Sequence, residues 1–444
     1  MSTIVALSTP PGRGAVAIVR ISGPDALRII GSLLKIESHL EPRKTSLRKI
    51  FKPESNDLLD LVLITTFPGP HSFTGEDVAE ISCHGSPAVV RQLLDLLLLR
   101  GARLAGPGGF TLRAVANGRM NLSQAEAIRD LIDAQTEAAA QQAARQVNGE
   151  LSNVLTPLKD RLVEVVVHLE SALEFVEDDL PTVKTMALQE TLRGVFDGIQ
   201  RLALSFKSGR LLTAGARITI LGLPNVGKSS LFNELVRFDR AIVTDKPGTT
   251  RDTLTETIDL KGVPVSVTDT AGLRDTTDVI ESMGIERTQR AMSEADLLLV
   301  VLDSSRPFSK DDELLLEQTS GHRRLIVQNK CDLVRGDDAT VGLNVSARTG
   351  AGIEDLRIAI LTTLHDGAGE AGGSLLVTNA RHHDLLVRAG HEVETAIQAL
   401  GDRLSEELIL ASLHNALRLF GEITGETTTE NILSEIFATF CIGK

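Results

Sequence analysis

The chain of 444 residues has no tryptophan, no tyrosine and only three cysteines. With Phe as its only aromatic residue, it lacks the stacking platforms on which sequence-independent binders of single-stranded nucleic acid usually rely. Cys83, Cys331 and Cys441 cannot form a disulfide framework, and no Cys-x-x-Cys pair predicts a zinc or redox site. These absences exclude a disulfide-stapled secreted protein and favour a reducing compartment.

Long apolar runs and positive charge are also scarce. The leucine-rich stretch 93–99 is far shorter than the roughly 20 residues that cross a membrane, and the N-terminus does not resemble a signal peptide. Lys and Arg number 46 against 59 Asp and Glu, which gives a net charge of −13 and a pI of about 5.3. We expect a soluble cytoplasmic protein that meets any nucleic acid through local patches.

Length and residue pattern predict several domains. The chain is roughly three times as long as an ordinary domain, so two to four domains are expected. Short β-branched runs, such as 15–19 and 61–64, alternate with helical stretches up to about residue 118 and indicate a small α/β domain. Beyond that point Ser123 and Glu126 have the spacing of a capping box and predict the start of a long helical region.

The remaining periodicity predicts helices on both sides of a second α/β region. Apolar residues at helical spacing cover 151–173, where Pro157 bends or begins the helix, and 188–206. Three more helices are expected, the last opened by a capping box of Thr427 and Glu430. They span 381–400, 406–420 and 430–440. Because 217–364 instead alternates strands and helices and the Gly-rich 366–373 predicts a linker, an inserted α/β domain is the simplest architecture.

A glycine-rich loop joins a predicted strand to a predicted helix. Residues 222–229 read Gly-Leu-Pro-Asn-Val-Gly-Lys-Ser, which fits G-x-x-x-x-G-K-[ST] directly after the apolar strand 218–221. In such a loop, backbone N–H groups surround the phosphates, Lys228 supplies positive charge and the Ser229 hydroxyl ligates Mg²⁺. The alternative, a glycine-rich turn without a ligand, usually lacks both flanking elements.

Later elements in the same order predict that the nucleotide is GTP. Residues 269–272 read Asp-Thr-Ala-Gly and bring a carboxylate and a backbone N–H to the metal and the terminal phosphate. Asn329-Lys330-Cys331-Asp332 carries a carboxylate that can accept two hydrogen bonds from guanine, and 346–348 offers backbone N–H groups to its oxo group. The residues expected to contact GTP are Asn225, Val226, Gly227, Lys228, Ser229, Ser230, Thr244, Asp245, Lys246, Pro247, Gly248, Thr249, Thr250, Asp269, Thr270, Ala271, Gly272, Asn329, Lys330, Asp332, Ser346, Ala347 and Arg348.

The loop 244–252 lies between the two phosphate elements and has the composition of a switch. Thr250 would complete the Mg²⁺ shell, with Ser229, only while the γ-phosphate is present, although a plain surface loop is the alternative. Leu273 occupies the place where many small GTPases carry a water-orienting glutamine. Because leucine cannot orient water, another polar group from 274–286 has to do so.

Motifs outside the nucleotide loops point to a family. The motifs are Thr9-Pro-Pro-Gly-Arg-Gly14, Phe67-Pro-Gly-Pro70, Ser72-Phe-Thr-Gly-Glu-Asp77, Gln124-Ala-Glu-Ala-Ile128, Gly248-Thr-Thr-Arg-Asp252 and the ending Phe440-Cys-Ile-Gly-Lys444. With them the chain resembles, over essentially its whole length, the bacterial tRNA wobble-uridine modification GTPases called MnmE or TrmE.

This resemblance implies an α/β plus all-α architecture. It gives an N-terminal α/β domain (1–118) that dimerises and binds a tetrahydrofolate one-carbon donor in its 5-formyl or methylene form. A discontinuous helical domain (119–213 and 367–444) would carry an inserted Ras-like P-loop G domain (214–366). The family works as a homodimer with an FAD-containing partner, MnmG or GidA, in a heterotetramer. Together they add an aminomethyl or carboxymethylaminomethyl group to C5 of the wobble uridine of certain tRNAs.

The resemblance also implies site residues. Arg20, Glu80, Arg119 and Lys444 match the family's folate-contacting positions, with Arg119 where some members have lysine. Hydrolysis in the family depends on G-domain dimerisation and on K⁺. The K⁺ positions correspond to Asn225, Thr244, Lys246 and Thr249. Glu281 matches the proposed water-orienting glutamate; taken without the resemblance, it would be a solvated helix residue.

Two cysteines remain open candidates. Cys441 is either a nucleophile toward uracil or a one-carbon unit, or a small apolar residue packed beside Phe440 and Ile442. Cys83 and His84 suggest a Cys–His dyad, but neighbours on a strand face opposite sides of a sheet, so a loop or core position is the favoured alternative.

A second function also fits the G motifs. A GTP-gated ribosome-assembly or RNA-binding factor would use the same loops without one-carbon chemistry. Such factors usually carry a basic RNA-binding module, whereas amphipathic helices in an acidic chain flank this G domain. A purely structural dimer scaffold is a third reading, against which stand the intact Lys228, Ser229 and Asp332.

Overall fold

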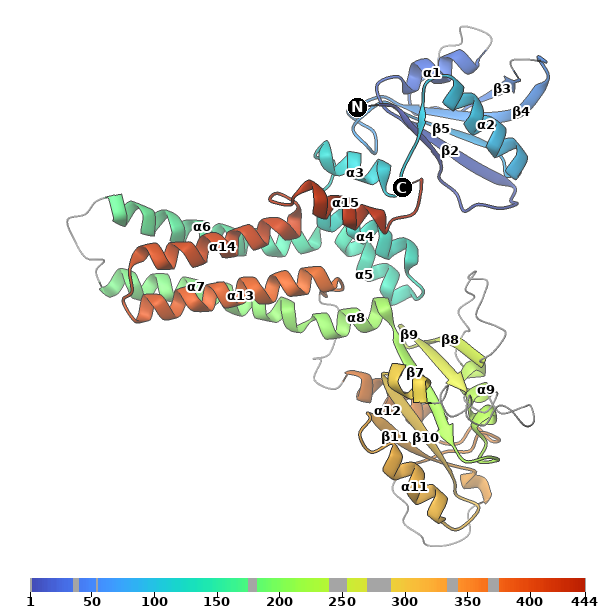
Figure 1. Ribbon diagram of the computed structural model, residues 1–444, viewed down its shortest axis with the longest axis vertical. Helices are drawn as coiled ribbons and strands as arrows, with labels where there is room; N and C mark the ends of the chain where they lie inside the picture. The colour runs from blue at the N-terminus through green and yellow to red at the C-terminus, as the bar shows by residue number, and fades with distance from the viewer. Residues whose placement is uncertain are drawn as a thin grey trace. The chain divides into compact units, whose positions relative to one another are not determined.

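The computed structural model describes residues 2–34, 40–52, 55–174, 182–238, 254–269, 289–333, 342–365 and 375–443 (Figure 1). The chain divides into two compact units, which we call unit 1 and unit 2. Unit 1 comprises 1–129, 147–152 and 421–444, and unit 2 comprises 130–146 and 153–420. Each unit contains one six-stranded sheet, in agreement with the predicted mixture of α/β and helical parts.

The sheet of unit 1 has the strand order β3-β4-β5-β2-β1-β6 and is antiparallel except for the β1–β6 pair. Its strands are β1 (Ile4–Leu7), β2 (Val16–Ser22), β3 (Ser46–Phe51), β4 (Leu58–Phe67), β5 (Val78–His84) and β6 (Arg103–Leu104). Helices α1 (Ala26–Leu33) and α2 (Pro87–Leu99) share a core with alternate strand residues such as Val19 and Ile21. Since side chains alternate along a strand, Arg20 lies on the opposite face.

Helix α3 (Gly109–Ala116) packs against that opposite face, and a second buried cluster joins helices from distant parts of the chain. Phe110 of α3 joins Ile4 and Ala6 in one cluster. Residues of α4 (Leu122–Asp133) join Phe437 of α15 (Glu430–Ala438) in another. The last described residues are joined to the first strand, because the Ser8 hydroxyl donates to the Gly443 carbonyl oxygen at 3.0 Å.

Both predicted capping boxes are wrong in their residues. Helix α4 is capped two positions earlier than expected, because Asn121 Oδ1 accepts from the Gln124 N–H and Gln124 Oε1 accepts from the Asn121 N–H. The side-chain oxygens of Asn and Gln can accept hydrogen bonds from backbone N–H groups as those of Ser and Glu do. Residue spacing alone therefore did not show whether Asn121 and Gln124 or Ser123 and Glu126 would cap the helix. In α15 the N-cap is Thr429 and its side chain makes no capping hydrogen bond.

The sheet of unit 2 has the order β12-β11-β10-β7-β9-β8 and is parallel except for the β8–β9 hairpin. Its strands are β7 (Ala216–Gly222), β8 (Leu254–Leu260), β9 (Val263–Asp269), β10 (Leu297–Asp303), β11 (Arg324–Asn329) and β12 (Leu343–Asn344). Its helices include α9 (Lys228–Phe238), α11 (Lys310–Gln318), α12 (Ile353–His365) and the short 3₁₀ turn η2 (Cys331–Leu333). Alternate residues of β10 enter two separate buried clusters, so both faces of this sheet are covered.

Long helices form the rest of unit 2. They are α5 (Glu137–Val147), α6 (Glu150–Glu174), α7 (Thr182–Leu204), α8 (Phe206–Ala214), α13 (Ala380–Gly401) and α14 (Glu406–Thr424). Helices α7 and α13 lie side by side (Figure 1). The predicted helices are confirmed, but Pro157 lies inside α6 and does not begin it. The predicted linker 366–373 lies outside the described residues, and no helix within the described ranges is long and apolar enough to cross a membrane.

Candidate functional site

The phosphate loop lies between β7 and α9, as its motif predicts. Asn225 and Gly227 both have positive φ angles, 63° and 94°, so the loop curls tightly before Lys228 begins the helix. A Cβ on Gly227 would lie 2.3 Å from Asn329 Nδ2. Only glycine fits there, because the loop packs directly against Asn329 at the end of β11.

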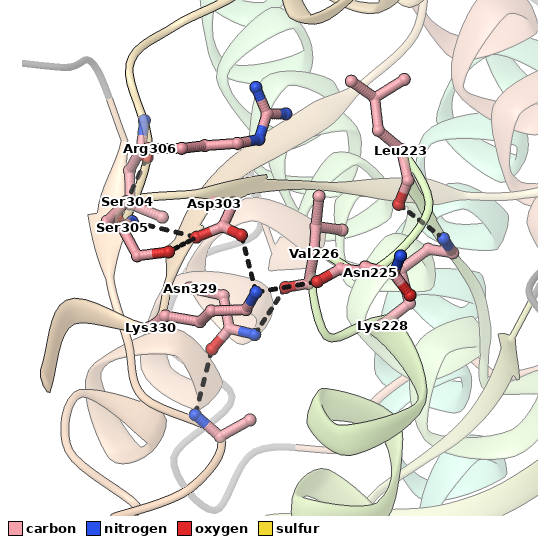
Figure 2. A network of polar contacts seen from close by, with 12 residues as sticks. Leu223, Asn225, Val226, Lys228, Asp303, Ser304, Ser305, Arg306, Asn329 and Lys330 are labelled. Atoms are coloured by element: carbon pink, nitrogen blue, oxygen red, sulfur yellow. Dashed lines mark hydrogen bonds and ion pairs between the residues drawn. The ribbon is translucent and has the colours of Figure 1, made fainter. Parts of the chain in front are cut away.

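The ammonium group of Lys228 is held over this loop. Lys228 is 8% exposed, and its Nζ donates to the carbonyl oxygens of Gly222 (3.0 Å) and Leu223 (2.9 Å). Figure 2 shows the bond to Leu223. The loop therefore presents a fixed positive charge next to its own backbone N–H groups, which suits a phosphate chain.

Ser229 meets the end of the neighbouring strand. Its hydroxyl donates to Asp269 Oδ2 at 2.7 Å, and Asp269, the last residue of β9, is fully buried. Parallel pairing of β7 with β9 brings the two residues together although 40 positions separate them. A hydroxyl and a carboxylate are oxygen donors of the kind that Mg²⁺ prefers.

Asn329 and Lys330 tie the guanine loop to the phosphate loop (Figure 2). Asn329 Nδ2 donates to the Val226 carbonyl oxygen at 2.9 Å, and its Oδ1 accepts from the Ala347 N–H at 3.1 Å. Lys330 Nζ donates to the Asn225 carbonyl oxygen at 2.8 Å. Two of the predicted guanine elements and the phosphate loop are therefore joined by direct hydrogen bonds.

Asp303, at the end of β10, is a member of this network that the motifs did not reveal. Its Oδ2 lies 2.6 Å from Lys330 Nζ. Burial acts to raise the pKa of Asp303, but hydrogen bonds from Lys330 and Ser305 outweigh it, so the pKa lies below the ordinary value of 3.8. Its position at the carboxyl end of a central parallel strand was the available signal.

The guanine loop also holds the carboxylate expected to select the base. Asp332 Oδ1 accepts from the Ser346 hydroxyl at 2.6 Å, and Ser346 is fully buried. The segment 346–348 thus fixes one oxygen of Asp332 beside Ala347, whose N–H already binds Asn329. Arg348 is exposed in this segment, and Ser230 is exposed in the first turn of α9.

Several predicted site residues lie outside the described residues, and their roles stay predictions. Among them are the proposed water-orienting Glu281 and the C-terminal Lys444. The others are Thr244, Asp245, Lys246, Pro247, Gly248, Thr249, Thr250, Thr270, Ala271 and Gly272.

A second polar site occupies the open face of the sheet in unit 1. Arg20 of β2 and Glu80 of β5 are register partners, and Arg20 Nη2 lies 2.8 Å from Glu80 Oε1. Their side chains are 22% and 27% exposed. The Arg20 guanidinium lies 5.4 Å from the ring centre of Phe73 and 5.7 Å from that of Phe110. The structure therefore joins two of the predicted folate residues and places aromatic rings beside them.

A buried network adjoins this pair. Glu76 Oε2 accepts from Arg113 Nη1 at 2.7 Å and from the Ser22 hydroxyl at 2.8 Å. Arg113 is 5% exposed, and Ser22 also contacts Thr74. Glu76 belongs to the motif 72–77, but nothing in the sequence connected that motif with Arg113. Arg119 is exposed beside Gly75 of the same motif, since a Cβ on Gly75 would lie 3.3 Å from Arg119 Cγ.

The cysteine predictions fare differently. Cys441 is exposed while Phe440 is buried, and both roles offered for Cys441 stay predictions. Cys83 is buried, and burial together with the Asp60 carboxylate raises its pKa to about 11. His84 pairs with Asp60 instead, with Nδ1 and Oδ1 2.6 Å apart, so the Cys–His dyad is wrong and the core position preferred for Cys83 is confirmed.

The phosphate loop, the Ser229–Asp269 contact and the guanine loop along one edge of a parallel sheet define a P-loop GTPase. The family model described as the MnmE helical domain matches residues 122–441, and that of the GTP-binding protein TrmE N-terminus matches 3–119. The chain belongs to the MnmE (TrmE) family of tRNA modification GTPases.

Full-length relatives agree with the family models. The tRNA modification GTPase MnmE of Koribacter versatilis (strain Ellin345) is 42% identical over 100% of this chain and 99% of its own length. That of Aquifex aeolicus (strain VF5) is 39% identical over 99% of each chain. A crystal structure of an Aquifex aeolicus Era variant bound to GDP.AlF4- matches 40% of this chain and 66% of its own, at 22% identity and a TM-score of 0.28. A similarity that low does not bear on function.

Proposed function

We propose that this GTPase uses GTP hydrolysis in unit 2 to drive folate-dependent modification of the wobble uridine of tRNA. The single observation that carries the folate half is the Arg20–Glu80 ion pair between two phenylalanine rings in unit 1. A fused bicyclic ring with hydrogen-bonding edges suits such a site, because guanidinium and carboxylate groups recognise the edge while aromatic rings cover the faces.

In unit 2, Mg²⁺ fits the described oxygen donors. Ser229 and Asp269 would hold it, with Thr250 completing the shell, and the bound ion would neutralise charge on the phosphates. Lys228 binds and orients the phosphate chain, and Asp332 selects guanine. We assign K⁺ to Asn225, Thr244, Lys246 and Thr249, of which Asn225 lies on the described phosphate loop, and we assign water orientation to Glu281.

In unit 1, a reduced folate would bind over Arg20 and Glu80. Arg119 lies beside the motif 72–77 and, with Lys444, would bind the carboxylates of the glutamate tail. The folate supplies the one-carbon unit when bound. Cys441 is exposed on the segment that also contacts Gly108, so it stays available as a nucleophile.

The finer assignments follow the family. The chain would act in the cytoplasm as a homodimer with an FAD-containing MnmG partner, in a heterotetramer, and G-domain dimerisation with K⁺ would activate hydrolysis. The product is an aminomethyl or carboxymethylaminomethyl group at C5 of the wobble uridine. The alternative of a ribosome-assembly factor without one-carbon chemistry is not favoured by any described contact.

Calorimetric titration of 5-formyltetrahydrofolate into the full chain tests the folate half. Removing the Arg20 side chain in Arg20→Ala breaks charge-assisted hydrogen bonds worth about 1.5–3 kcal/mol, so folate affinity should fall roughly ten- to a hundredfold. GTP hydrolysis should stay within twofold of wild type, and Arg28→Ala, an exposed arginine in the same unit, should change neither. Wild-type protein that binds no reduced folate would refute the proposal.

A further inference from the structure

The turn between β8 and β9 is held by a helix of the helical region. The Thr136 hydroxyl donates to the Gly262 carbonyl oxygen at 2.8 Å and accepts from the Ala139 N–H at 3.2 Å. Thr136 therefore caps α5 and binds the turn with the same oxygen atom. It is 5% exposed and lies 126 positions from Gly262, within the same compact unit.

This contact is closely fitted. Gly262 has a φ of 95°, and a Cβ there would lie 2.8 Å from Ala138 Cβ, so the turn approaches α5 as closely as backbone permits. The Gly262 N–H donates to Asp259 Oδ1 at 2.6 Å. On the outer side of the turn, Lys261 pairs with Glu354 of α12 at 2.8 Å. Because of this close packing, a movement of the turn has to displace the start of α5 or break the Thr136–Gly262 hydrogen bond.

The same helix holds the chain where it returns from the inserted domain. Gln142 and Gln146 are buried, and both donate to the Leu376 carbonyl oxygen, at 2.8 and 2.9 Å. Gln146 also contacts the Thr378 hydroxyl. Helix α5 and its cap residue thus contact the nucleotide-binding domain at Gly262 and the chain just after that domain at Leu376 and Thr378. Thr136, Gln142 and Gln146, which make these contacts, are all nearly inaccessible to water.

The other end of the hairpin belongs to the nucleotide site. Strands β8 and β9 pair without interruption over seven residues each, from Leu260↔Val263 at the turn to Leu254↔Asp269. Asp269 accepts the hydrogen bond from Ser229, and the six steps of about 3.3 Å from Val263 to Asp269 put it about 20 Å from the turn. Thr136 cannot touch a nucleotide, but a regular two-stranded ladder connects it to a residue that does.

We propose that α5 reads the nucleotide state of the G domain through the Thr136–Gly262 contact, with Thr136 as a positioning residue. Binding of the metal and the γ-phosphate beside Ser229 would shift Asp269. Through the β8–β9 hairpin this shift would strengthen or weaken the hydrogen bond of Thr136 to Gly262, and with it the cap of α5. This inference rests on GTP binding and is independent of the folate chemistry proposed above. Linkage is reciprocal, so a contact that differs between nucleotide states must also alter the relative affinities for the two nucleotides.

The test compares Thr136→Val with Thr136→Ser in the full chain. Valine has the same shape without the hydroxyl, whereas serine keeps it. Kd values would be measured for GDP and for guanosine 5′-(β,γ-imido)triphosphate. We expect the ratio of the two affinities to change at least threefold in Thr136→Val and to match wild type in Thr136→Ser. A folded Thr136→Val that leaves the ratio within error overturns the proposal, because a merely structural contact would shift both affinities equally.

Hydrogen exchange on the wild-type chain provides an independent reading if Thr136→Val does not fold. The amides of Ala139 and Ala140 in the first turn of α5 should exchange at different rates with the two nucleotides bound. Identical rates would overturn the proposal. Failure of the wild-type chain to bind either nucleotide would instead refute the GTPase assignment itself, so the two failures are distinguishable.

Discussion

The two sheets of this molecule place their sites differently. The mostly antiparallel sheet of unit 1 is covered by α1 and α2 on one face, and its polar residues Arg20 and Glu80 lie on the other face. The parallel strands of unit 2 are buried on both faces, and polar residues such as Asp269 and Asn329 come where strands end. The polar residues of the two sites therefore lie on a face of the antiparallel sheet but at an edge of the parallel one.

The units also differ in charge. Unit 1 contains 16 Lys and Arg against 16 Asp and Glu, whereas unit 2 contains 30 against 43. The whole net charge of −13 thus belongs to unit 2, and unit 1 is formally neutral. Although the chain as a whole is acidic, unit 1 therefore has no net charge that would repel tRNA. The net charge of the whole sequence does not reveal this difference.

We call the polar residues on the sheet of unit 1 (Arg20, Glu80, Glu76 and Arg113) the face site, and the nucleotide loops of unit 2 the edge site. The largest effect expected is on the stability that the face site contributes to the fold. Replacing Arg113 by Ala leaves Glu76 buried without its ion-pair partner, and breaking such pairs costs about 3–5 kcal/mol. Urea unfolding should show this loss, while the exposed Arg28→Ala in the same unit should cost less than about 0.5 kcal/mol. If Arg113→Ala were as stable as Arg28→Ala, the face site would not depend on its buried network.

The edge site should respond to Lys228→Ala in binding rather than in stability. Loss of a charged donor to phosphate costs about 1.5–3 kcal/mol, so GTP affinity should fall roughly ten- to a hundredfold. Folate affinity should be unchanged in the same protein. Arg237→Ala, an exposed cation on the same helix α9, provides the control. A parallel loss of folate binding would show that the two sites are not independent.

A smaller effect concerns pH at the edge site. Because the pKa of Asp303 is lowered, its ionised form stabilises the fold above its unfolded pKa of roughly 3.9, and that contribution is lost as pH falls through the lower folded value. Wild type should therefore exceed Asp303→Asn in stability by about 1 kcal/mol at pH 7, and the difference should disappear as pH falls through the lowered pKa of Asp303. Lys330→Met should remove the same pH dependence. An unchanged difference at low pH would contradict the ion pair's role.

Sequence alone predicted the edge site better than the face site. The loops of an edge site are contiguous motifs at strand ends, so Lys228 and Asp332 could be located by pattern and order. The face site depends on strand register, which pairs Arg20 with Glu80 across 60 positions, and on the packing of Arg113 against Glu76. Residue spacing contains no information about either contact; only the family resemblance pointed to Arg20 and Glu80.

The sequence also did not show which residue would make a given hydrogen bond where several residue types can make it. Asn121 caps α4 as well as Ser123 could have, and His84 found its partner in Asp60, 24 positions away, and not in the adjacent Cys83. The contact of Thr136 with Gly262 had no sequence signal, because a threonine before a helix already has a local explanation as a cap.

The bond between Ser8 and Gly443 spans 435 positions and has a consequence for the order of folding. During translation all of unit 2, including its sheet, is synthesised before residues 421–444, which complete unit 1. These last residues include Ile442, which forms a β-bridge with Pro107. Unit 1 is therefore begun first and finished last. Its six strands, all within residues 4–104, emerge before unit 2, but the Ser8–Gly443 bond and the Pro107–Ile442 bridge cannot form until translation is nearly over.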